Sequence, residues 1–105
     1  MSAFDVSVRR QGSTLVVVPS GELDIATVAR VRGALADRAA GEGVEIDLRD
    51  LQFLDTSGLQ LVVETHRHAR EEGYDLRIVR GSPQVQRVFE IAGLDRVLPF
   101  ADAPA

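Results

Sequence analysis

Residues 53–63 read FLDTSGLQLVV, in which a carboxylate, two hydroxyls and a glycine stand between large apolar residues. Apolar flanks are typical of buried segments, whereas Asp-Thr-Ser-Gly at residues 55–58 combines residue types that favour turns and helix starts. A stripe of residues follows at helical spacing, apolar except for one histidine: Leu59, Val62, Val63, His66 and Ala69. The stretch therefore predicts a loop that opens a helix near Ser57, and Gly73 is the residue type that commonly ends one.

The chain before this loop predicts a hairpin, a helix and a third strand. Residues 3–20 alternate between polar and apolar side chains and then enter a largely β-branched run, which is the pattern of two paired strands. Asp24 is a suitable N-cap for a helix that extends to about Ala39. The apolar residues of that helix would be Ile25, Val28, Val31 and Leu35. Residues 44–48 alternate again and predict a strand directly before the loop.

The chain after the loop predicts a strand, a short helix and a final strand. Leu76 and Ile78 are the apolar positions of the strand. Ser82 is an N-cap residue followed by Pro83, and proline is favoured at the first position of a helix. Residues 97–100 predict the last short strand. Strands that alternate with helices define the α/β class, and the crossover helices make much of the sheet parallel.

The chain is expected to form one domain over residues 1–105, with its core at about residues 4–100, because this length suffices for one hydrophobic core but not for two. Asp24 and Thr56 each open a helix that follows a strand. Since sites in α/β sheets gather at the carboxyl ends of the strands, we expect these two residues at the same edge of the sheet.

Composition and spacing exclude several kinds of site. The net charge of −4 and the absence of a basic stripe with interleaved aromatic residues argue against nucleic acid as the main partner. The chain has no cysteine, so it can form no thiolate metal site. His66 and His68 are two apart on a predicted helix and point about 200° away from each other, so they cannot bind one metal ion together.

Sequence motifs for catalysis and for membranes are missing as well. The chain contains neither phosphate-binding glycine motif, and it lacks the glycine pattern around Ser57 that a nucleophile elbow requires. We therefore expect no enzyme, no cofactor and no nucleotide bound by the chain itself. No apolar stretch approaches the roughly 20 residues that span a bilayer, and the first residues lack the pattern of a signal peptide. A cytoplasmic protein without direct membrane binding is expected.

The loop at residues 55–58 allows two interpretations. Helix capping alone would satisfy one or two backbone amides and contribute about 1 kcal/mol, but it requires only one short polar residue. Here three such residues stand in a row, which leaves Thr56 or Ser57 available at a helix N-terminus. A phosphate there would meet free N–H groups and the positive end of the helix dipole. The loop is thus either a plain helix start or the display of a functional hydroxyl.

Three motifs together resemble the STAS domain of the anti-sigma factor antagonist (anti-anti-sigma) type. They are Gly21-Glu22-Leu23-Asp24, Ile46-Asp47-Leu48 and Phe53-Leu54-Asp55-Thr56-Ser57-Gly58-Leu59. The likeness runs from about residue 4 to residue 100, with the elements in the same order. It implies the STAS fold, which is a mixed sheet of four to five strands with helices mainly on one face.

The resemblance also implies a mechanism. Antagonists of this kind bind an anti-sigma factor that is also a Ser/Thr kinase, and so free a sigma factor for transcription. The kinase phosphorylates the hydroxyl residue directly after the motif aspartate, which is Thr56 here, and a phosphatase of the PP2C type reverses this step. The acceptor is more commonly serine in these antagonists, so Ser57 is a secondary candidate. The partner-binding surface would consist of five residues, namely Asp24, Asp55, Thr56, Ser57 and Gly58.

STAS domains also serve in other assemblies. The Asp-Thr-x-Gly-Leu motif that begins at Asp55 is compatible with subunits of lipid-transport ATPases, in which the same loop docks on an ABC-type ATPase and needs no phosphorylation. The resemblance therefore implies a phosphorylation-switched antagonist, with a constitutive docking subunit of such an ATPase as the alternative. A neighbouring gene for a kinase-like ATPase or for a permease would discriminate between them.

Overall fold

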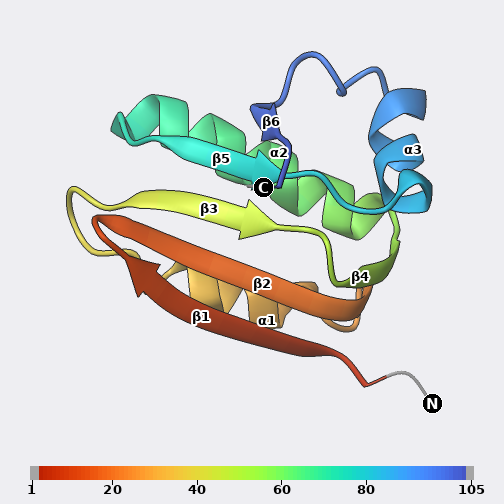
Figure 1. The fold of residues 1–105 in the computed structure, drawn as a ribbon, viewed down its shortest axis with the longest axis horizontal. Helices are drawn as coiled ribbons and strands as arrows, with labels where there is room; N and C mark the ends of the chain where they lie inside the picture. The colour runs from red at the N-terminus through yellow and green to blue at the C-terminus, as the bar shows by residue number, and fades with distance from the viewer. Residues whose placement is uncertain (1–2, 104–105) are drawn as a thin grey trace.

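The computed structural model describes residues 3–103, and a mixed six-stranded sheet forms its centre (Figure 1). The strands are β1 (Asp5–Gln11), β2 (Thr14–Leu23), β3 (Gly43–Asp47), β4 (Leu51–Leu54), β5 (Leu76–Val79) and β6 (Phe100–Ala101). β1 and β2 form the predicted antiparallel hairpin, and Gly12 adopts a φ of 61° in its turn. The strand order is β1-β2-β3-β5-β6, with β4 paired to β2, and every pairing except the hairpin is parallel.

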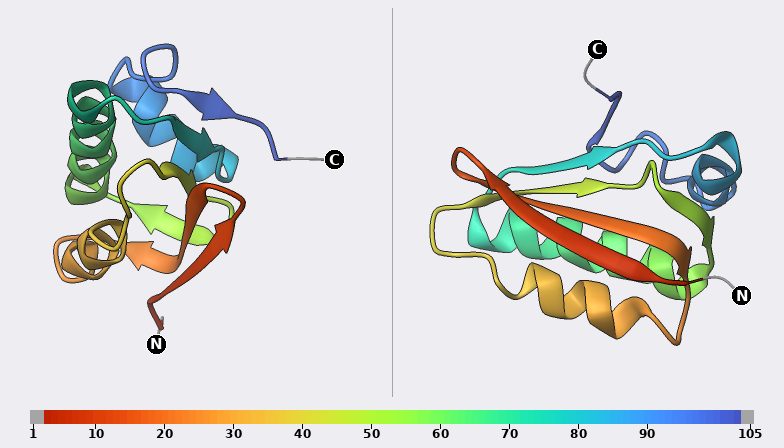
Figure 2. Two further views of the ribbon diagram at one scale, coloured as in Figure 1. Left: turned by 90° about the vertical axis from the view of Figure 1, so that its left-hand side faces the viewer. Right: turned by 60° about the horizontal axis from the view of Figure 1, so that its bottom comes forward.

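Three helices accompany the sheet, namely α1 (Val28–Leu35), α2 (Thr56–Glu72) and α3 (Pro83–Ile91). α1 and α2 lie side by side on one face of the sheet, whereas α3 lies at the end of the sheet against β4 (Figure 2). The expected placement of the helices mainly on one face is therefore confirmed for α1 and α2. The predicted end of α2 and the predicted start of α3 also hold. Gly73 closes α2 with a φ of 77°, and the Ser82 hydroxyl accepts a hydrogen bond from Val85 N.

The helix expected to reach about Ala39 is shorter and ends at Leu35. The cause is a contact with the hairpin. Glu42 accepts a hydrogen bond from the backbone N–H of Ala39 at 2.8 Å, and its carboxylate is held by Arg10 of β1 at 2.8 Å. This arrangement turns residues 36–42 away from the helix axis, and periodicity along α1 carries no signal of it.

Two strands differ from the sequence prediction. Residues 51–54, for which the sequence pattern predicted no strand, form β4, which pairs in parallel with the last residues of β2. The pairing requires β2 to continue past an irregularity in register between Gly21 and Glu22. The last strand was expected at residues 97–100, and the structure places it at Phe100–Ala101, with turns before it. The sheet therefore has six strands instead of four to five.

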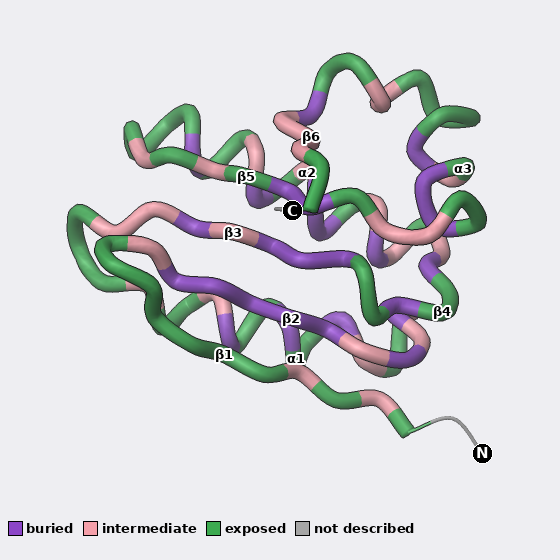
Figure 3. The backbone as a smooth tube through the Cα atoms, viewed as in Figure 1, coloured by how far each residue is buried: buried purple, intermediate pink, exposed green. Residues whose placement is uncertain are grey.

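The hydrophobic core lies between the sheet and the two helices on its face. Buried residues are concentrated on β2, β3 and β5 and on parts of α1 and α2 (Figure 3). Their side chains form one core cluster, which also includes Phe89 of α3. On the opposite face none of the helices within residues 3–103 covers the sheet, yet Val16 and Val79 are buried. Charged residues alternate with these valines, and Glu45 and Arg77 form an ion pair of 3.8 Å on neighbouring strands. The bare face is therefore largely polar.

Candidate functional site

The loops that follow β2 and β4 lie together at the carboxyl edge of the sheet. Leu23, the last residue of β2, pairs with Leu54, the last residue of β4. The backbone N–H of Asp55 then donates to the carbonyl of Leu23 at 3.2 Å. Asp24 and Asp55 therefore leave adjacent parallel strands in the same direction, and the prediction that Asp24 and Thr56 share one edge is confirmed.

Asp55 caps the first turn of α2. Its Oδ1 accepts hydrogen bonds from Ser57 N at 2.8 Å and from Gly58 N at 3.4 Å, and its carbonyl accepts from Leu59 N at 3.0 Å. The helix begins at Thr56, one residue before the predicted position. The expectation of free N–H groups is wrong for these two amides, because the Asp55 carboxylate already occupies them. An anion at this helix start would stand beside a carboxylate.

The two hydroxyls differ in accessibility. Thr56 is exposed, whereas Ser57 is half-buried. The Thr56 hydroxyl has no hydrogen-bond partner within the part of the chain that the structure describes. The Thr56 oxygen can therefore be reached from solvent without breaking an internal hydrogen bond.

Gly58 allows α2 to lie close to the strand ends. A Cβ atom at this position would come within 2.9 Å of Leu54 Cγ and 3.0 Å of Leu23 Cγ. Real Cβ atoms do not approach carbon so closely, so any larger residue would push the helix start away from β2 and β4. Gly58 thereby fixes where Thr56 is presented.

Asp24 holds a turn rather than capping α1. Its Oδ1 accepts from the backbone N–H of Ala26 at 2.9 Å, and its carbonyl accepts from Val28 N at 2.9 Å. The Thr27 hydroxyl accepts from Asp24 N at 3.0 Å and donates to the carbonyl of Glu22 at 2.8 Å. α1 consequently starts at Val28, after Thr27. Asp24 therefore makes the hydrogen bonds of an N-cap, but it caps a turn over residues 24–27 that precedes α1 and not the helix itself.

The turn changes the position of Ile25. The sequence pattern placed this residue on the buried stripe of a helix, but 78% of it is exposed to solvent. Glu22, Asp24 and Asp55 lie at the same paired strand ends and are acidic, and the nearest arginine along the chain, Arg30, is 3.6 Å from Asp5 in an ion pair. The edge around Thr56 therefore combines an exposed hydroxyl, an exposed apolar side chain and carboxylates.

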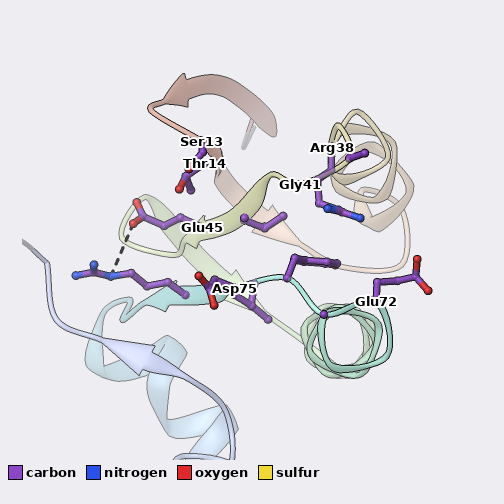
Figure 4. Close-up of a pocket in the computed structure, with 14 residues that line it drawn as sticks. Ser13, Thr14, Arg38, Gly41, Glu45, Glu72 and Asp75 are labelled. Carbon is purple, nitrogen blue, oxygen red and sulfur yellow. Dashed lines mark ion pairs between the residues drawn. The ribbon is translucent and has the colours of Figure 1, made fainter.

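Two surface pockets lie away from this edge. One, of about 540 Å³, lies at the amino ends of the parallel strands and is lined by Thr14, Glu45 and Asp75 among others (Figure 4). The other, of about 490 Å³, lies between α1 and α2, where Arg38 stacks on Tyr74 with its guanidinium 3.9 Å from the ring centre. Neither pocket is lined by Asp24, Asp55 or Thr56. The Thr56 edge therefore remains the candidate site.

Other kinds of site can be assessed over residues 3–103. In that range no cluster of three or more histidine, cysteine, aspartate or glutamate side chains could hold a metal ion. His66 is half-buried, and exposed His68 places its Nδ1 2.9 Å from the Tyr74 hydroxyl. None of the helices in the same range is long and apolar enough to cross a membrane.

Comparisons with known proteins agree with this architecture. The family model described as the STAS domain matches residues 5–105, so the chain belongs to the STAS domain family. Within it the chain is related to anti-sigma factor antagonists. It is 28% identical over 102 residues to the anti-sigma F factor antagonist of Paenibacillus polymyxa, a match that covers 94% of this chain and 87% of that protein.

Solved structures of such antagonists share the fold. A crystal structure of an anti-sigma factor antagonist from Mycobacterium paratuberculosis superposes with a TM-score of 0.85 at 25% identity, covering 96% of this chain and 87% of that chain. The antagonist SpoIIAA in its unphosphorylated form gives a TM-score of 0.76 at 26% identity, covering 97% of this chain and 89% of that chain. The expected STAS fold is thus confirmed.

Proposed function

We propose that this chain is an anti-sigma factor antagonist that binds an anti-sigma factor with Ser/Thr kinase activity and is released when that kinase phosphorylates Thr56. The single observation that carries the proposal is the exposed, unbonded Thr56 hydroxyl at a rigid helix start. The kinship with anti-sigma factor antagonists supplies the class of partner. One of these relatives is described in an unphosphorylated form, which supports a phosphorylation switch in the present chain.

The geometry around Thr56 explains how a phosphate would release the partner. A phosphothreonine adds nearly two negative charges. A kinase must hold the γ-phosphate of ATP at the Thr56 oxygen, so after transfer the new phosphate faces the remaining diphosphate. Asp55 adds to this repulsion, because its carboxylate already occupies the amides of Ser57 and Gly58.

The size of the effect follows from Coulomb's law. One added unit of like charge at about 4 Å costs on the order of 4 kcal/mol at an effective dielectric constant near 20. That free energy corresponds to roughly a thousandfold loss of affinity. The switch therefore needs no refolding of the chain, since the charge alone is sufficient.

The remaining roles follow from this mechanism. The chain acts by binding, as its non-catalytic relatives do, and the kinase partner provides the nucleotide. A phosphatase of the PP2C type would restore the free hydroxyl and the bound state. The surface for the partner comprises Asp24, Asp55, Thr56, Ser57 and Gly58. Because sigma factors act on cytoplasmic RNA polymerase, the site of action would be the cytoplasm, without nucleic acid or membrane as a direct partner.

The experiment that tests the proposal is affinity capture with the tagged chain from its source cell, followed by mass spectrometry of the bound proteins and of the Thr56 peptide. We expect a kinase-type anti-sigma factor and a phosphate on Thr56. Thr56→Ala should retain the kinase permanently and Thr56→Glu should lose it, whereas Ser57→Ala should still be phosphorylated on Thr56.

Two other outcomes of the capture experiment would contradict the proposal. Capture of an ABC-type ATPase with no phosphate on the chain would favour a constitutive docking subunit. Equal retention of the kinase by Thr56→Glu and by the wild type would refute the charge mechanism.

A further inference from the structure

Large apolar side chains remain exposed at a few positions of the described chain, and two of them border the Thr56 edge. The exposed positions are Val8, Ile25, Phe53, Ile91 and Val97. Ile25 directly follows Asp24, and Phe53 stands two residues before Asp55 on β4. Ile25 is the most exposed of the set, at 78%, and Phe53 is 42% exposed. Apolar surface is thus available where the hydroxyl is displayed.

The exposure of Ile25 is built into the local structure. The Asp24 carboxylate and the Thr27 hydroxyl bond to the backbone on both sides of Ile25 and hold the turn that precedes α1. A helix starting at Asp24 would have turned this side chain toward the core, as the sequence pattern suggested. A side chain that is already fixed in its exposed position loses little conformational freedom when a partner covers it.

The charges around Ile25 restrict what can cover it. Glu22, Asp24 and Asp55 lie at the paired ends of β2 and β4 from which Ile25 projects, and the nearest arginine along the chain, Arg30, is 3.6 Å from Asp5 in an ion pair and donates to the carbonyl of Phe4. An anionic membrane surface or a nucleic acid would be repelled by these carboxylates. A protein with an apolar socket, bordered by hydrogen-bond donors that match the free carboxylate oxygens, is complementary to this arrangement.

We infer that Ile25 is the apolar anchor by which the chain docks on its kinase partner, with Phe53 at the border of the same contact. This inference rests on the proposed function, because the partner is the kinase that acts on Thr56. Ile25 would supply binding energy, whereas Thr56 would supply the switch. Loss of the Ile25 side chain should therefore weaken docking without slowing phosphate transfer in the docked complex.

The test uses the purified kinase that phosphorylates the wild-type chain, loaded with ADP for calorimetry and with ATP for kinetics. Ile25→Ala should raise the Kd and the KM by roughly ten- to a hundredfold and leave kcat unchanged. Ile91→Ala is the matched control, because Ile91 is 76% exposed but lies at the end of α3. That variant should bind like the wild type, and both variants should keep the wild-type melting temperature.

The possible failures are distinguishable. Wild-type affinity of Ile25→Ala, or an equal loss of affinity in Ile91→Ala, would overturn the inference and leave the proposed function intact. If no kinase binds or phosphorylates the wild-type chain, the proposed function is refuted, and the role of Ile25 is refuted with it.

Discussion

Replacement of Gly58 by alanine should destabilise the fold, although alanine is the better helix former. The added Cβ would lie 2.9 Å from Leu54 Cγ, 3.0 Å from Leu23 Cγ and 3.1 Å from Leu23 Cδ2. Both leucines are almost fully buried, at 2% and 1% exposure, and Cγ is their branch point. Neither side chain can swing away, so the helix start itself has to move.

The magnitude follows from two opposing terms. Exchanging glycine for alanine within a helix stabilises it by up to about 1 kcal/mol. Forcing an extra carbon into a packed site costs about 1–3 kcal/mol, and contacts this short at two branch points place Gly58 in the upper part of that range. The net loss should be about 1–2 kcal/mol. For a domain of this size each kcal/mol lowers the melting temperature by about 4–8 °C.

Gly33 provides the matched control. It lies within α1, and a Cβ atom there would meet nothing within 4 Å. Gly33→Ala should therefore gain about 0.5–1 kcal/mol, in the direction opposite to Gly58→Ala. Urea unfolding followed by circular dichroism measures both variants. If Gly58→Ala proved as stable as the wild type or more stable, the close seating of α2 on the strand ends would be refuted.

Two further predictions concern carboxylates. Asp55→Ala should lose about 1 kcal/mol of stability in urea unfolding because the cap of α2 disappears, and Asp55→Asn should recover most of this loss. Equal stability of the Ala variant and the wild type would contradict the capping role. Burial raises the pKa of Asp47, but its hydrogen bonds with Arg49, the shortest of them 2.7 Å, outweigh this effect and hold the pKa below the ordinary value. A depressed folded-state pKa means that the pair stabilises the fold above about pH 4 and that this stability is lost as the pH falls through the folded pKa. Asp47→Asn should therefore make the free energy of unfolding fall less steeply at acid pH. An unchanged fall would contradict the pairing.

Elements whose determinants are local were predictable from the sequence. α2 carries its own apolar stripe, the Asp55 side chain that caps it and Gly73 that ends it, so its bounds were found within one residue. α1 was misplaced because its ends depend on other contacts. The Thr27 hydroxyl bonds back to Glu22, and the other end is set by the hairpin. β4 was missed because four residues carry little periodicity, and only pairing with β2 makes them a strand.

The candidate site was predictable in its residues but not in their bonds. The order of strands and helices placed Asp24 and Thr56 at one edge, and the parallel pairing of β2 and β4 agrees with it. It could not show that Asp55 occupies two amides of the first turn or that Asp24 holds a turn. The exposure of Ile25 was hidden for the same reason, because its position depends on hydrogen bonds that helical spacing does not encode.

The most direct test of the central claim is the affinity of the ADP-loaded kinase for two purified forms of the chain, one unmodified and one carrying phosphate on Thr56 alone. Isothermal titration at a fixed salt concentration would give both dissociation constants. The account predicts that phosphorylation weakens binding by roughly a thousandfold while the melting temperature stays near that of the unmodified chain. Equal affinity of the two forms for the kinase would contradict it.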